Sequence, residues 1–477
     1  MSIGSILNTA RSGLIASQRA VEVSSNNIAN AQTEGYSRQR VDLAAEQPIR
    51  FPSGEFGSGV RITGSSRARD FFLDSSYRRA AGDAAGGRMR AETLKRMEAI
   101  LGEPGDNRLA AALDAFHSAW SDLATRPTAS GVRGAVQETG AQVAQQLNRA
   151  AEQLDAMQAE TRQRMASSVD EVNALANEVA GLNKEIVAQE SGGHSANTLR
   201  DARDTRIDRL VALTGGEVIE ADNGGVAFLL GGLSLVDGTQ VQPLSATTLS
   251  GVTEVTRANL TTRPVQIGGE LGALRRVSVV DIPAMQRDLD AFARGIVDGV
   301  NAIHRQGVTW SGTPPVSAPA GDFFASDATF APETDPLRAA RGIRLDSAVA
   351  TSSDAIAASV AAATGPGDGS VALQLSGLRT AAVSFTNPDG SARVSESSSA
   401  FLQRITTDVA FTTRSAADAA DIDAAIALQS DSRRQSVSGV SVDEELVRLI
   451  KFQQSYAAAA RLISIAESMS QSLLDIR

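Results

Sequence analysis

Two stripes of apolar and small residues, one at each end of the 477-residue chain, constrain the fold more than any other feature. Within each stripe the members lie alternately three and four residues apart, which is the spacing of a coiled-coil seam. The N-terminal stripe comprises Ile3, Leu7, Ala10, Leu14, Ser17, Val21, Ser24, Ile28 and Ala31, and the C-terminal stripe comprises Leu449, Phe452, Tyr456, Ala459, Ile463, Ala466, Ser470 and Leu473. Because one amphipathic helix cannot bury such a stripe alone, we predict an antiparallel pair that makes a terminal domain of residues 1–36 and 440–477.

The first stripe runs into the segment 26–36, which reads Asn-Asn-Ile-Ala-Asn-Ala-Gln-Thr-Glu-Gly-Tyr. Its amide side chains compete with the backbone for hydrogen bonds, and Gly35 can take the left-handed conformation that ends a helix. Helix termination accounts for Asn27, Asn30 and Gly35, but it does not account for Tyr36. Because an aromatic ring with a polar tip suits a subunit contact, we expect Tyr36 to serve at such a contact.

The periodicity of the intervening chain predicts a mainly α-helical protein with β-rich insertions. Residues 37–310 together with 399–439 are predicted to form a helical bundle. This bundle contains a hairpin at 37–65 and a β-rich insertion at 212–274. Residues 311–398 are predicted to form a smaller, β-containing outer excursion. A chain of this length should divide into several domains, and we expect an elongated molecule.

Helix starts and stops subdivide the predicted bundle. The chain is strongly helical over 89–190, with breaks at 102–105 and at Pro127, which cannot continue a helix. A regular apolar stripe predicts another helix over 281–304. The last helix should begin at Ser441, which is followed by acidic residues suited to the first turn.

Composition excludes several classes of function. The formal net charge is −10, so we exclude nucleic-acid binding, which favours a clustered basic face. There is no cysteine, which excludes disulfides and thiolate metal sites. The first residues lack the basic head and apolar run of a signal peptide, and no segment has the length of a membrane span, so we expect neither.

We find no set of residues suited to catalysis, to a cofactor or to a metal ion. None of His117, His194 and His304 has a second histidine four residues away, as a helical metal site would require. We expect His117 and His304 to face solvent or neighbouring helices, and His194 to lie in a loop. The glycines of 365–369 lack the lysine of a phosphate loop and indicate a turn. The alternating charges of 201–209 predict a solvated helix face with weak ion pairs.

Several motifs resemble one family of proteins. The residues Asn26, Asn27, Ile28, Ala29, Asn30, Gly35 and Tyr36 are similar to the N-terminal signature of bacterial flagellar rod, hook and hook-associated proteins. The runs Phe116-x-x-Ala119-Trp120-x-x-Leu123-Ala124-x-x-Pro127, Asn301-Ala302-x-His304-x-x-Gly307 and Gln453-Gln454-x-Tyr456-x-Ala458-x-Ala460-Arg461 resemble the hook-associated protein 1 family in particular. Rod and hook proteins lack the long helical region that contains the first of these runs. That run therefore favours the hook-associated protein 1 family over rod and hook proteins.

The resemblance implies a structural protein that polymerises through its terminal helices and joins the flagellar hook to the filament. It implies contacts with further copies of the chain, with the hook protein, and with the second junction protein and flagellin. It also implies an export chaperone on the C-terminal helix. Export would proceed through the flagellar apparatus without a cleaved signal, which places the protein outside the cell in the flagellum.

Two alternatives remain open. The chain could be another axial protein, such as a hook or distal-rod protein, from which the helical block 89–190 distinguishes it. It could also be a surface enzyme on a flagellar scaffold, although no converging acid, base or metal set supports this. The seam can be completed within one chain or between copies, and the sequence is compatible with both. We hypothesise that the terminal helices become ordered only when copies assemble.

Overall fold

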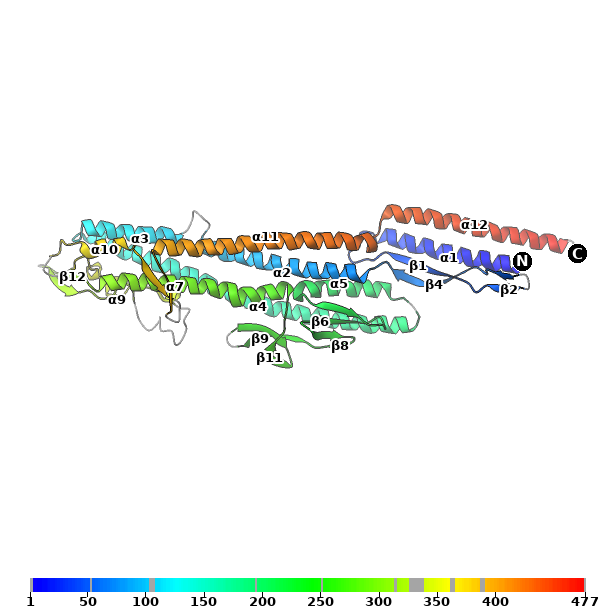
Figure 1. The fold of residues 1–477 in the computed structure, drawn as a ribbon, viewed down its shortest axis with the longest axis horizontal. Coiled ribbons are helices and arrows are strands. Elements are labelled where there is room, and N and C mark those ends of the chain that lie inside the picture. Colours follow the sequence, from blue (N-terminus) through cyan, green and yellow to red (C-terminus); the bar gives the residue numbers. More distant parts are fainter. Residues whose placement is uncertain are drawn as a thin grey trace.

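In the computed structural model the long helices run along one axis and form an extended rod (Figure 1). The structure describes residues 3–51, 54–102, 108–193, 195–249, 252–312, 315–325, 339–360, 365–386 and 391–475. Both chain termini lie at the same end of the rod. The architecture is mainly α-helical with small antiparallel sheets, which confirms the predicted fold class.

The terminal helices α1 (Ile3–Ala29) and α12 (Val442–Asp475) lie side by side and run in opposite directions (Figure 1). The predicted pairing of the two ends is therefore confirmed. Helix α12 begins directly after Ser441, whose Oγ accepts a hydrogen bond from the backbone N–H of Glu444 at 3.5 Å. Such a bond supplies a partner for one of the free N–H groups at a helix start.

A long hairpin follows α1 and packs along it. Strand β1 (Gln39–Ala45) pairs with β4 (Val60–Arg67), and β2 (Ile49–Phe51) pairs with β3 (Gly54–Phe56) towards the tip. Both β1 and β4 contact α1. The terminal end of the rod therefore consists of α12, α1 and this hairpin (Figure 1).

The body of the rod is built from long helices. They are α2 (Phe71–Leu101), α3 (Arg108–Thr125), α4 (Ser130–Ser191), α5 (Asn197–Thr214) and α11 (Ser398–Ser438). At 1.5 Å per residue, the 62 residues of α4 span about 90 Å. The interruptions after Leu101 and Thr125 confirm the breaks predicted near Gly102 and Pro127.

A β-rich segment is attached to the side of the rod. Its strands are β5 (Glu217–Glu220), β6 (Val226–Leu230), β7 (Leu233–Asp237), β8 (Gln240–Val241), β9 (Leu244–Leu249), β10 (Val252–Arg257) and β11 (Leu260–Pro264). The first four form one antiparallel sheet and the last three form another. The strands start later and end earlier than the predicted segment 212–274, because α5 continues to Thr214 and α6 (Gly269–Arg276) begins before its end.

The predicted helix at 281–304 is present as α7 (Ile282–His304), and a π-helical turn at Val277–Asp281 joins it to α6. Beyond it, the distal end of the rod contains short elements. These are β12 (Val308–Ser311), β13 (Val316–Pro319), α8 (Ala339–Gly342), α9 (Ser347–Thr351), η3 (Ser353–Ala355), α10 (Ser370–Gly377), β14 (Val383–Thr386) and β15 (Ala392–Glu396).

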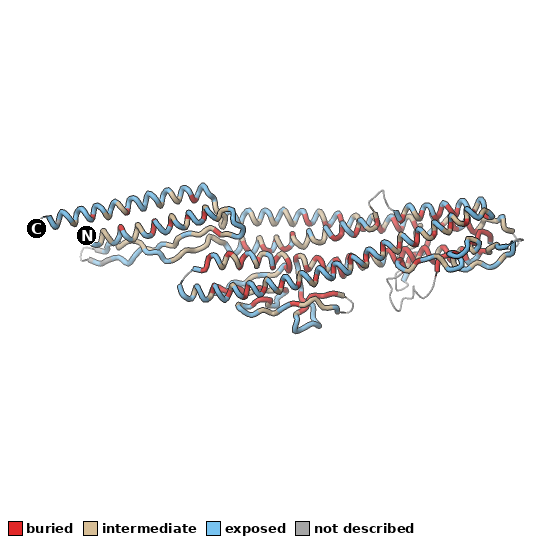
Figure 2. Tube along the Cα trace, turned by 180° about the vertical axis from the view of Figure 1, so that it is seen from behind, coloured by how far each residue is buried: buried red, intermediate tan, exposed pale blue. Residues whose placement is uncertain are grey.

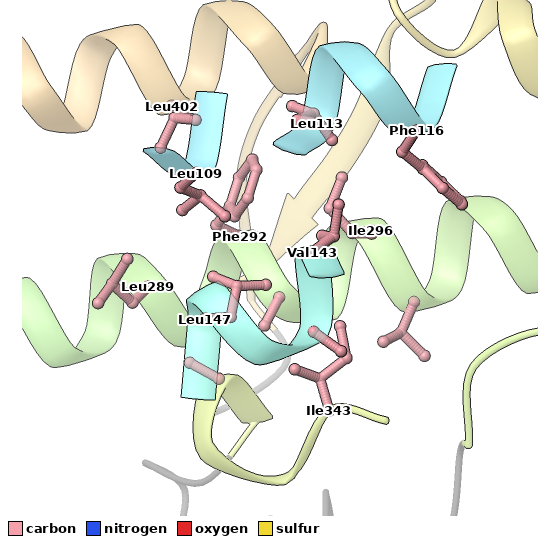
Figure 3. Packing of buried hydrophobic residues seen from close by; sticks show 14 of the residues in the cluster. Leu109, Leu113, Phe116, Val143, Leu147, Leu289, Phe292, Ile296, Ile343 and Leu402 are labelled. Carbon is pink, nitrogen blue, oxygen red and sulfur yellow. The ribbon is translucent and has the colours of Figure 1, made fainter. Parts of the chain in front are cut away.

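The largest buried cluster fills the distal half of the rod (Figures 2 and 3). Figure 3 shows Leu113 and Phe116 of α3 near Val143 of α4 and Phe292 and Ile296 of α7. The described residues of 311–398 share this core, because Phe323, Ala340, Val371 and Phe385 are buried within the same cluster. The expected outer excursion is thus packed into the end of the bundle, and it contains short helices as well as strands.

A second cluster lies nearer the terminal end. It joins the later part of α4, the helices α5 and α6, and the inner faces of the β-rich segment. Phe228 of β6 and Val236 of β7 are buried in it, as are Val172 and Val179 of α4. Because α4 contributes to both clusters, one continuous helix links the two halves of the body.

Of the two environments expected for His117 and His304, solvent or neighbouring helices, the structure supports the second. His304 and His117 are buried rather than facing solvent, at 0% and 3% exposure. The ring of His304 is held at both nitrogens: Nδ1 donates to the carbonyl of Gly321 at 2.7 Å, and Nε2 accepts from the N–H of Ala357 at 2.9 Å. His304 therefore ties α7 to two distal loops. His194 lies outside the described residues.

Candidate assembly interface

The buried side of the terminal helix pair consists mainly of small residues. The buried members are Ala10, Ala16, Ser17, Ala20, Ser24 and Asn27 on α1 and Glu445, Ala459 and Ala466 on α12. The backbones come close together there, since a Cβ placed on Gly13 would lie 4.0 Å from the Cβ of Ala459. Close approach of this kind requires small side chains on at least one helix.

The residues of the predicted seam fall into three groups. Ala10, Ala459 and Ala466 are buried, and Tyr456 is exposed at 41%. The half-buried members are Ile3, Leu7, Leu14, Val21, Ile28, Leu449, Phe452 and Ile463. The side chain of Leu473 lies outside what the structure describes. Whether these residues make contacts between copies stays a prediction.

On α1, Ala10, Ser17 and Ser24 of the predicted seam are buried, but the alternate positions of the buried stripe are shifted by one residue. Ala20 and Asn27 are buried, whereas the neighbouring Val21 and Ile28 are only half-buried. The sequence analysis preferred the larger apolar side chains for the centre of the contact. The small ones occupy it because they let the helix axes approach, and the larger ones then pack at its flanks.

Helix α12 leaves a second apolar row uncovered. Its exposed members are Leu446, Val447, Ile450, Leu462, Ile465, Met469 and Leu474, each between 44% and 69% exposed. At 100° per residue, Leu446, Val447, Ile450 and Ile465 project from the side of the helix opposite Glu445, Ile463 and Ala466. Leu462 and Met469 lie at the flank next to Ala466, and Leu474 lies on the seam side. Figure 2 shows α12 as mostly exposed along its length. Exposed apolar side chains gathered in this way on one helix typically mark a binding surface.

The signature residue Asn27 connects α1, the hairpin and α12. Its Nδ2 donates to the carbonyl of Gln39 at 2.8 Å and to Oε2 of Glu445 at 3.1 Å. Its Oδ1 accepts from the N–H of Gln39 at 3.0 Å and from the hydroxyl of Tyr36 at 2.8 Å. The amide therefore makes all four hydrogen bonds available to it, and it is fully buried.

The hydroxyl of Tyr36 is used within the chain, and whether the ring also makes a subunit contact stays a prediction. The hydroxyl lies 2.8 Å from Oδ1 of Asn27 and 3.0 Å from Oδ1 of Asn26. Burial, with the charges of Asp201 and Glu445, raises the pKa of Tyr36 to about 12. The hydroxyl is therefore a stable donor at physiological pH. This answers why a tyrosine follows the asparagines.

Gly35 allows the chain to turn from α1 into the hairpin. Its φ of +78° lies in the left-handed region, and a Cβ at this position would lie 2.4 Å from Oγ1 of Thr205 on α5. Glycine is therefore required by the backbone conformation and by the close contact with α5. The next residues continue this attachment, since Ser37 N–H donates to Asp201 at 3.3 Å and Arg38 N–H donates to the carbonyl of Ser438 at 2.9 Å.

A buried network of charges lies where the terminal helix pair and the hairpin attach to the body of the rod. We call this attachment region the joint. Asp204 on α5 accepts from Arg67 of β4 at 2.6 Å, and from Arg69 at 2.8 Å and Arg78 at 3.1 Å. Asp201 accepts from Arg67 at 2.8 Å. Burial alone would raise the pKa of Asp204, but the guanidinium groups of Arg69, Arg67 and Arg78 outweigh this effect and lower its pKa to about 2.

The network extends to α11. Asp208 accepts from Arg78 at 2.7 Å and from Arg434 at 3.0 Å, and the guanidinium of Arg434 lies 3.7 Å from the ring centroid of Tyr77. Four elements, β4, α2, α5 and α11, therefore meet through charged side chains at the point where the terminal pair joins the rod. The joint is held by directional contacts rather than by a hydrophobic core.

This network corrects the interpretation of 201–209 as a solvated face. Asp201, Asp204 and Asp208 lie three and four residues apart, so they share one face of α5, and that spacing was the signal the sequence analysis missed. Arg203 also is fully buried and donates to Oδ1 of Asn183 at 3.0 Å and to the carbonyl of Gly224 at 2.7 Å. Arg206 and Arg209 do pair at the surface, as predicted.

Within the described part of the chain, no three histidine, aspartate or glutamate side chains are arranged to hold a metal ion. None of the described helices is long and apolar enough to cross a membrane. The two terminal helices and their joint are thus the candidate functional site.

Three family models match successive parts of this chain. Residues 94–324 match the model of the flagellar hook-associated protein FlgK helical domain. Residues 7–36 match the model of the flagella basal body rod protein, and residues 432–476 match that of the flagellar basal body rod FlgEFG protein C-terminal region. The chain is also 28% identical to flagellar hook-associated protein 1 of Bacillus subtilis (strain 168), over 98% of this chain and 97% of that protein.

By these matches the chain is similar to the hook-associated protein 1 family over nearly its whole length. Members from Salmonella typhimurium and Escherichia coli (strain K12) are 27% identical over 64% and 68% of this chain, and the matches cover 57% and 60% of those proteins. A solved structure of the flagellar hook junction protein FlgK from Burkholderia pseudomallei matches 54% of this chain and 47% of that one, with 22% identity and a TM-score of 0.47.

The pattern of matches separates the ends from the middle. The two matches to rod-protein models cover most of α1 and all of α12, and the match to the FlgK helical domain covers the body from the end of α2 through α7. The ends are therefore the part that this family shares with other flagellar axial proteins. The helical body distinguishes the family from them.

Proposed function

We propose that this chain is a structural protein of the bacterial flagellum that connects the hook to the filament and assembles through its terminal helix pair. The observation that supports the mode of assembly most strongly is the uncovered apolar row of α12. A helix with seven large apolar side chains exposed to water gains free energy when another surface covers them. Further copies of the chain around the flagellar axis would supply that surface.

The terminal pair is suited to forming late. Its buried side is small, since among the α12 side chains that the structure describes only Glu445, Ala459 and Ala466 are buried within one chain. Isolated pairs with so little buried apolar surface are marginally stable. We propose that the ends of the exported monomer are disordered, and that burial between copies offsets the entropy cost of ordering them.

This ordering can be measured by circular dichroism. The proposal predicts higher helical content per residue in assembled material than in the purified monomer. The rise should come from α1 and α12, which hydrogen exchange can localise because their amides would exchange fast in the monomer and slowly after assembly. Equal helical content and equal protection in both states would contradict late ordering.

We also propose the partners that the family implies. The hook protein would lie on one side of the assembled ring, and the second junction protein and flagellin on the other. Before export, a chaperone would cover α12, whose exposed apolar row would otherwise favour aggregation. The protein would leave the cell through the flagellar export apparatus without a cleaved signal and would need no catalytic activity.

Deletion of this protein in its source bacterium tests the junction role. We expect cells with hooks but without filaments, and flagellin released into the medium. Reintroducing the full-length chain should restore filaments. Cells without hooks would move the assignment to a rod or hook protein, and cells with normal filaments would contradict a junction role altogether.

A further inference from the structure

We propose that the buried contact between Asn27 and Glu445 sets the register of the terminal helix pair. It joins the last turn of α1 to the first turn of α12, at 3.1 Å and with the two residues 0% and 1% exposed. This assignment goes beyond the junction role, because it concerns how one chain aligns its own ends. It can be tested on the purified full-length protein.

Apolar packing alone selects the register only weakly. The α1 side of the contact repeats small residues every seven positions, as Ala10, Ser17 and Ser24, and again as Gly13 and Ala20. On α12, Ala459 and Ala466 are both buried and also lie seven residues apart. A shift of one heptad in one direction would place Gly13 opposite Ala466 and Ala20 opposite Ala459, so small residues would again face one another, whereas a shift in the other direction would place Phe452 opposite Gly13.

Two observed contacts fix the register present in the structure. Gly13 faces Ala459, and Asn27 faces Glu445. Asn27 lies fourteen residues after Gly13, and Glu445 lies fourteen residues before Ala459, so the two contacts are two heptads apart on both helices. The layer at Gly13 tolerates a shift towards Ala466, but the layer at Asn27 does not.

Asn27 cannot turn to follow a shifted partner. Three of its four hydrogen bonds go to its own segment: two to the backbone of Gln39 and one to the hydroxyl of Tyr36. These bonds hold the amide plane, and the remaining N–H is directed at α12. The Asn and Tyr of the signature thus act together, with Tyr36 as a positioning residue.

A shift in either direction would leave a buried polar group without its partner. Moved one heptad in one direction, Glu445 would face Ala20, and its carboxylate would lose the amide donor. Moved in the other direction, Asn27 would face Phe452, which accepts no hydrogen bond from an amide at normal strength. Unsatisfied buried groups of this kind destabilise the misaligned pair, as a buried Asn does in coiled coils that select one register.

Because the chain contains no cysteine, engineered cysteine pairs can report the register directly. Gly13→Cys with Ala459→Cys reports the native register, since the 4.0 Å separation suits a disulfide. Gly13→Cys with Ala466→Cys, and Gly13→Cys with Phe452→Cys, report shifts of one heptad in the two directions. The readout is the ratio of disulfide yields, which does not require most molecules to be paired, because oxidation traps each paired molecule.

In the parent chain we expect the native pair to form at least about tenfold more disulfide than either shifted pair. In chains carrying Asn27→Leu and Glu445→Leu together, which remove both polar groups of the contact between the helices, we expect the three yields to agree within about threefold. The double variant Arg19→Ala and Glu22→Ala removes an exposed ion pair of α1 and should leave the parent ratio unchanged.

A ratio that stays the same in the Asn27→Leu, Glu445→Leu chain would overturn the proposal, and so would equal yields in the parent chain. Tyr36→Phe should reduce the ratio by an intermediate amount, because Asn27 then loses one of the bonds that orient it. Scoring filaments on cells that carry the same variants is a separate experiment. Loss of the register preference with normal filaments would support the register contact and count against α1–α12 alignment as a requirement for assembly.

Discussion

At the scale of single residues, polar side chains are buried where elements must meet in one arrangement. Asn27 has all its hydrogen bonds made, and Asp204 is surrounded by three arginines. Buried charges of this kind add little to stability when paired, but they are costly when a partner is removed. The joint between the terminal pair and the rod should therefore be sensitive to neutral substitutions that change little in volume.

Asp204→Asn tests this sensitivity. We expect it to destabilise the folded chain at pH 7 by about 3 kcal/mol, because three buried guanidinium groups lose their shared carboxylate. Denaturant unfolding followed by circular dichroism measures the change. Glu178→Gln, which removes an exposed ion pair with Arg206, is the matched control and should cost less than about 1 kcal/mol.

The lowered pKa of Asp204 also predicts an acid dependence. Since its pKa is about 2 in the folded chain, below the usual value of 3.8, its contribution is complete above pH 4 and is lost as the pH falls towards 2. The contribution corresponds to about 2 kcal/mol. Unfolding of the Asp204→Asn variant should lack this part of the pH dependence. The same acid dependence in parent and variant would contradict the assignment.

The environment of His304 predicts that the stability of the folded chain also depends on pH in a milder range. Burial lowers the pKa of His304, and its Nε2 accepts a bond from Ala357, so the neutral ring is the folded form. Stability from this residue is present above the usual pKa near 6.5 and is lost as the pH falls below it. The pKa of His117, lowered by burial to about 4, acts in the same direction.

We therefore expect the distal core to be less stable at pH 5 than at pH 7, and His304→Gln to reduce that difference. The ring of Trp120 packs edge-on to that of His304, with centroids 6.4 Å apart, so tryptophan fluorescence can follow unfolding there. His117 remains in the variant and should leave a smaller pH effect. An unchanged pH dependence would show that His304 is not the group responsible.

At the scale of elements, α12 has two sides with different tasks. Its seam side packs on α1 with Ala459 and Ala466, and its outer side exposes Ile465 and its neighbours. Ile463 is half-buried at the seam, and it lies two residues from Ile465 on the opposite side. Substitutions at these adjacent positions can therefore separate pairing within a chain from contact between chains.

Ile463→Asp and Leu449→Asp should block assembly by placing a charge in the seam, while the body of the rod stays folded. Ile465→Asp should leave the seam intact and still reduce filament number by about tenfold or more, because the outer row loses its apolar contact. Thr261→Asp in β11 adds the same charge at an exposed position away from the terminal pair and should be tolerated. Filament counts by microscopy, with circular dichroism of each purified chain, decide the outcome. Normal filaments from the Ile465→Asp strain would argue against the outer row as a contact.

The terminal helices could be predicted from the sequence because their heptad spacing is long and regular. The exact face of α1 could not, since the spacing at 20–21 and 27–28 fits both a small and a large residue in the centre. Only the close approach at Gly13 and the hydrogen bonds of Asn27 distinguish them. The charge network was missed for a related reason: the arginines that bury Asp204 come from β4 and α2, far away in the sequence.

At the scale of the whole molecule, the rod separates a terminal end that has little core from a body with two buried clusters. The sequence indicated the mainly helical body through its apolar stripes, but it did not reveal that residues 311–398 share the distal core, because their short elements carry no clear period. The division fits a protein that folds its body alone and completes its ends on assembly. The charged joint lies between the two parts.

The central claim is that the outer row of α12 is covered by neighbouring copies. Its most direct test is maleimide labelling of the single cysteine in an Ile465→Cys chain, free in solution and in isolated flagella, with the exposed Thr261→Cys of β11 as the control. We predict fast labelling at 465 in the free chain and about tenfold slower labelling after assembly. Labelling of Thr261→Cys in the free chain measures the reactivity of the maleimide towards an exposed cysteine. Equal labelling of residue 465 in both states would contradict assembly through this face.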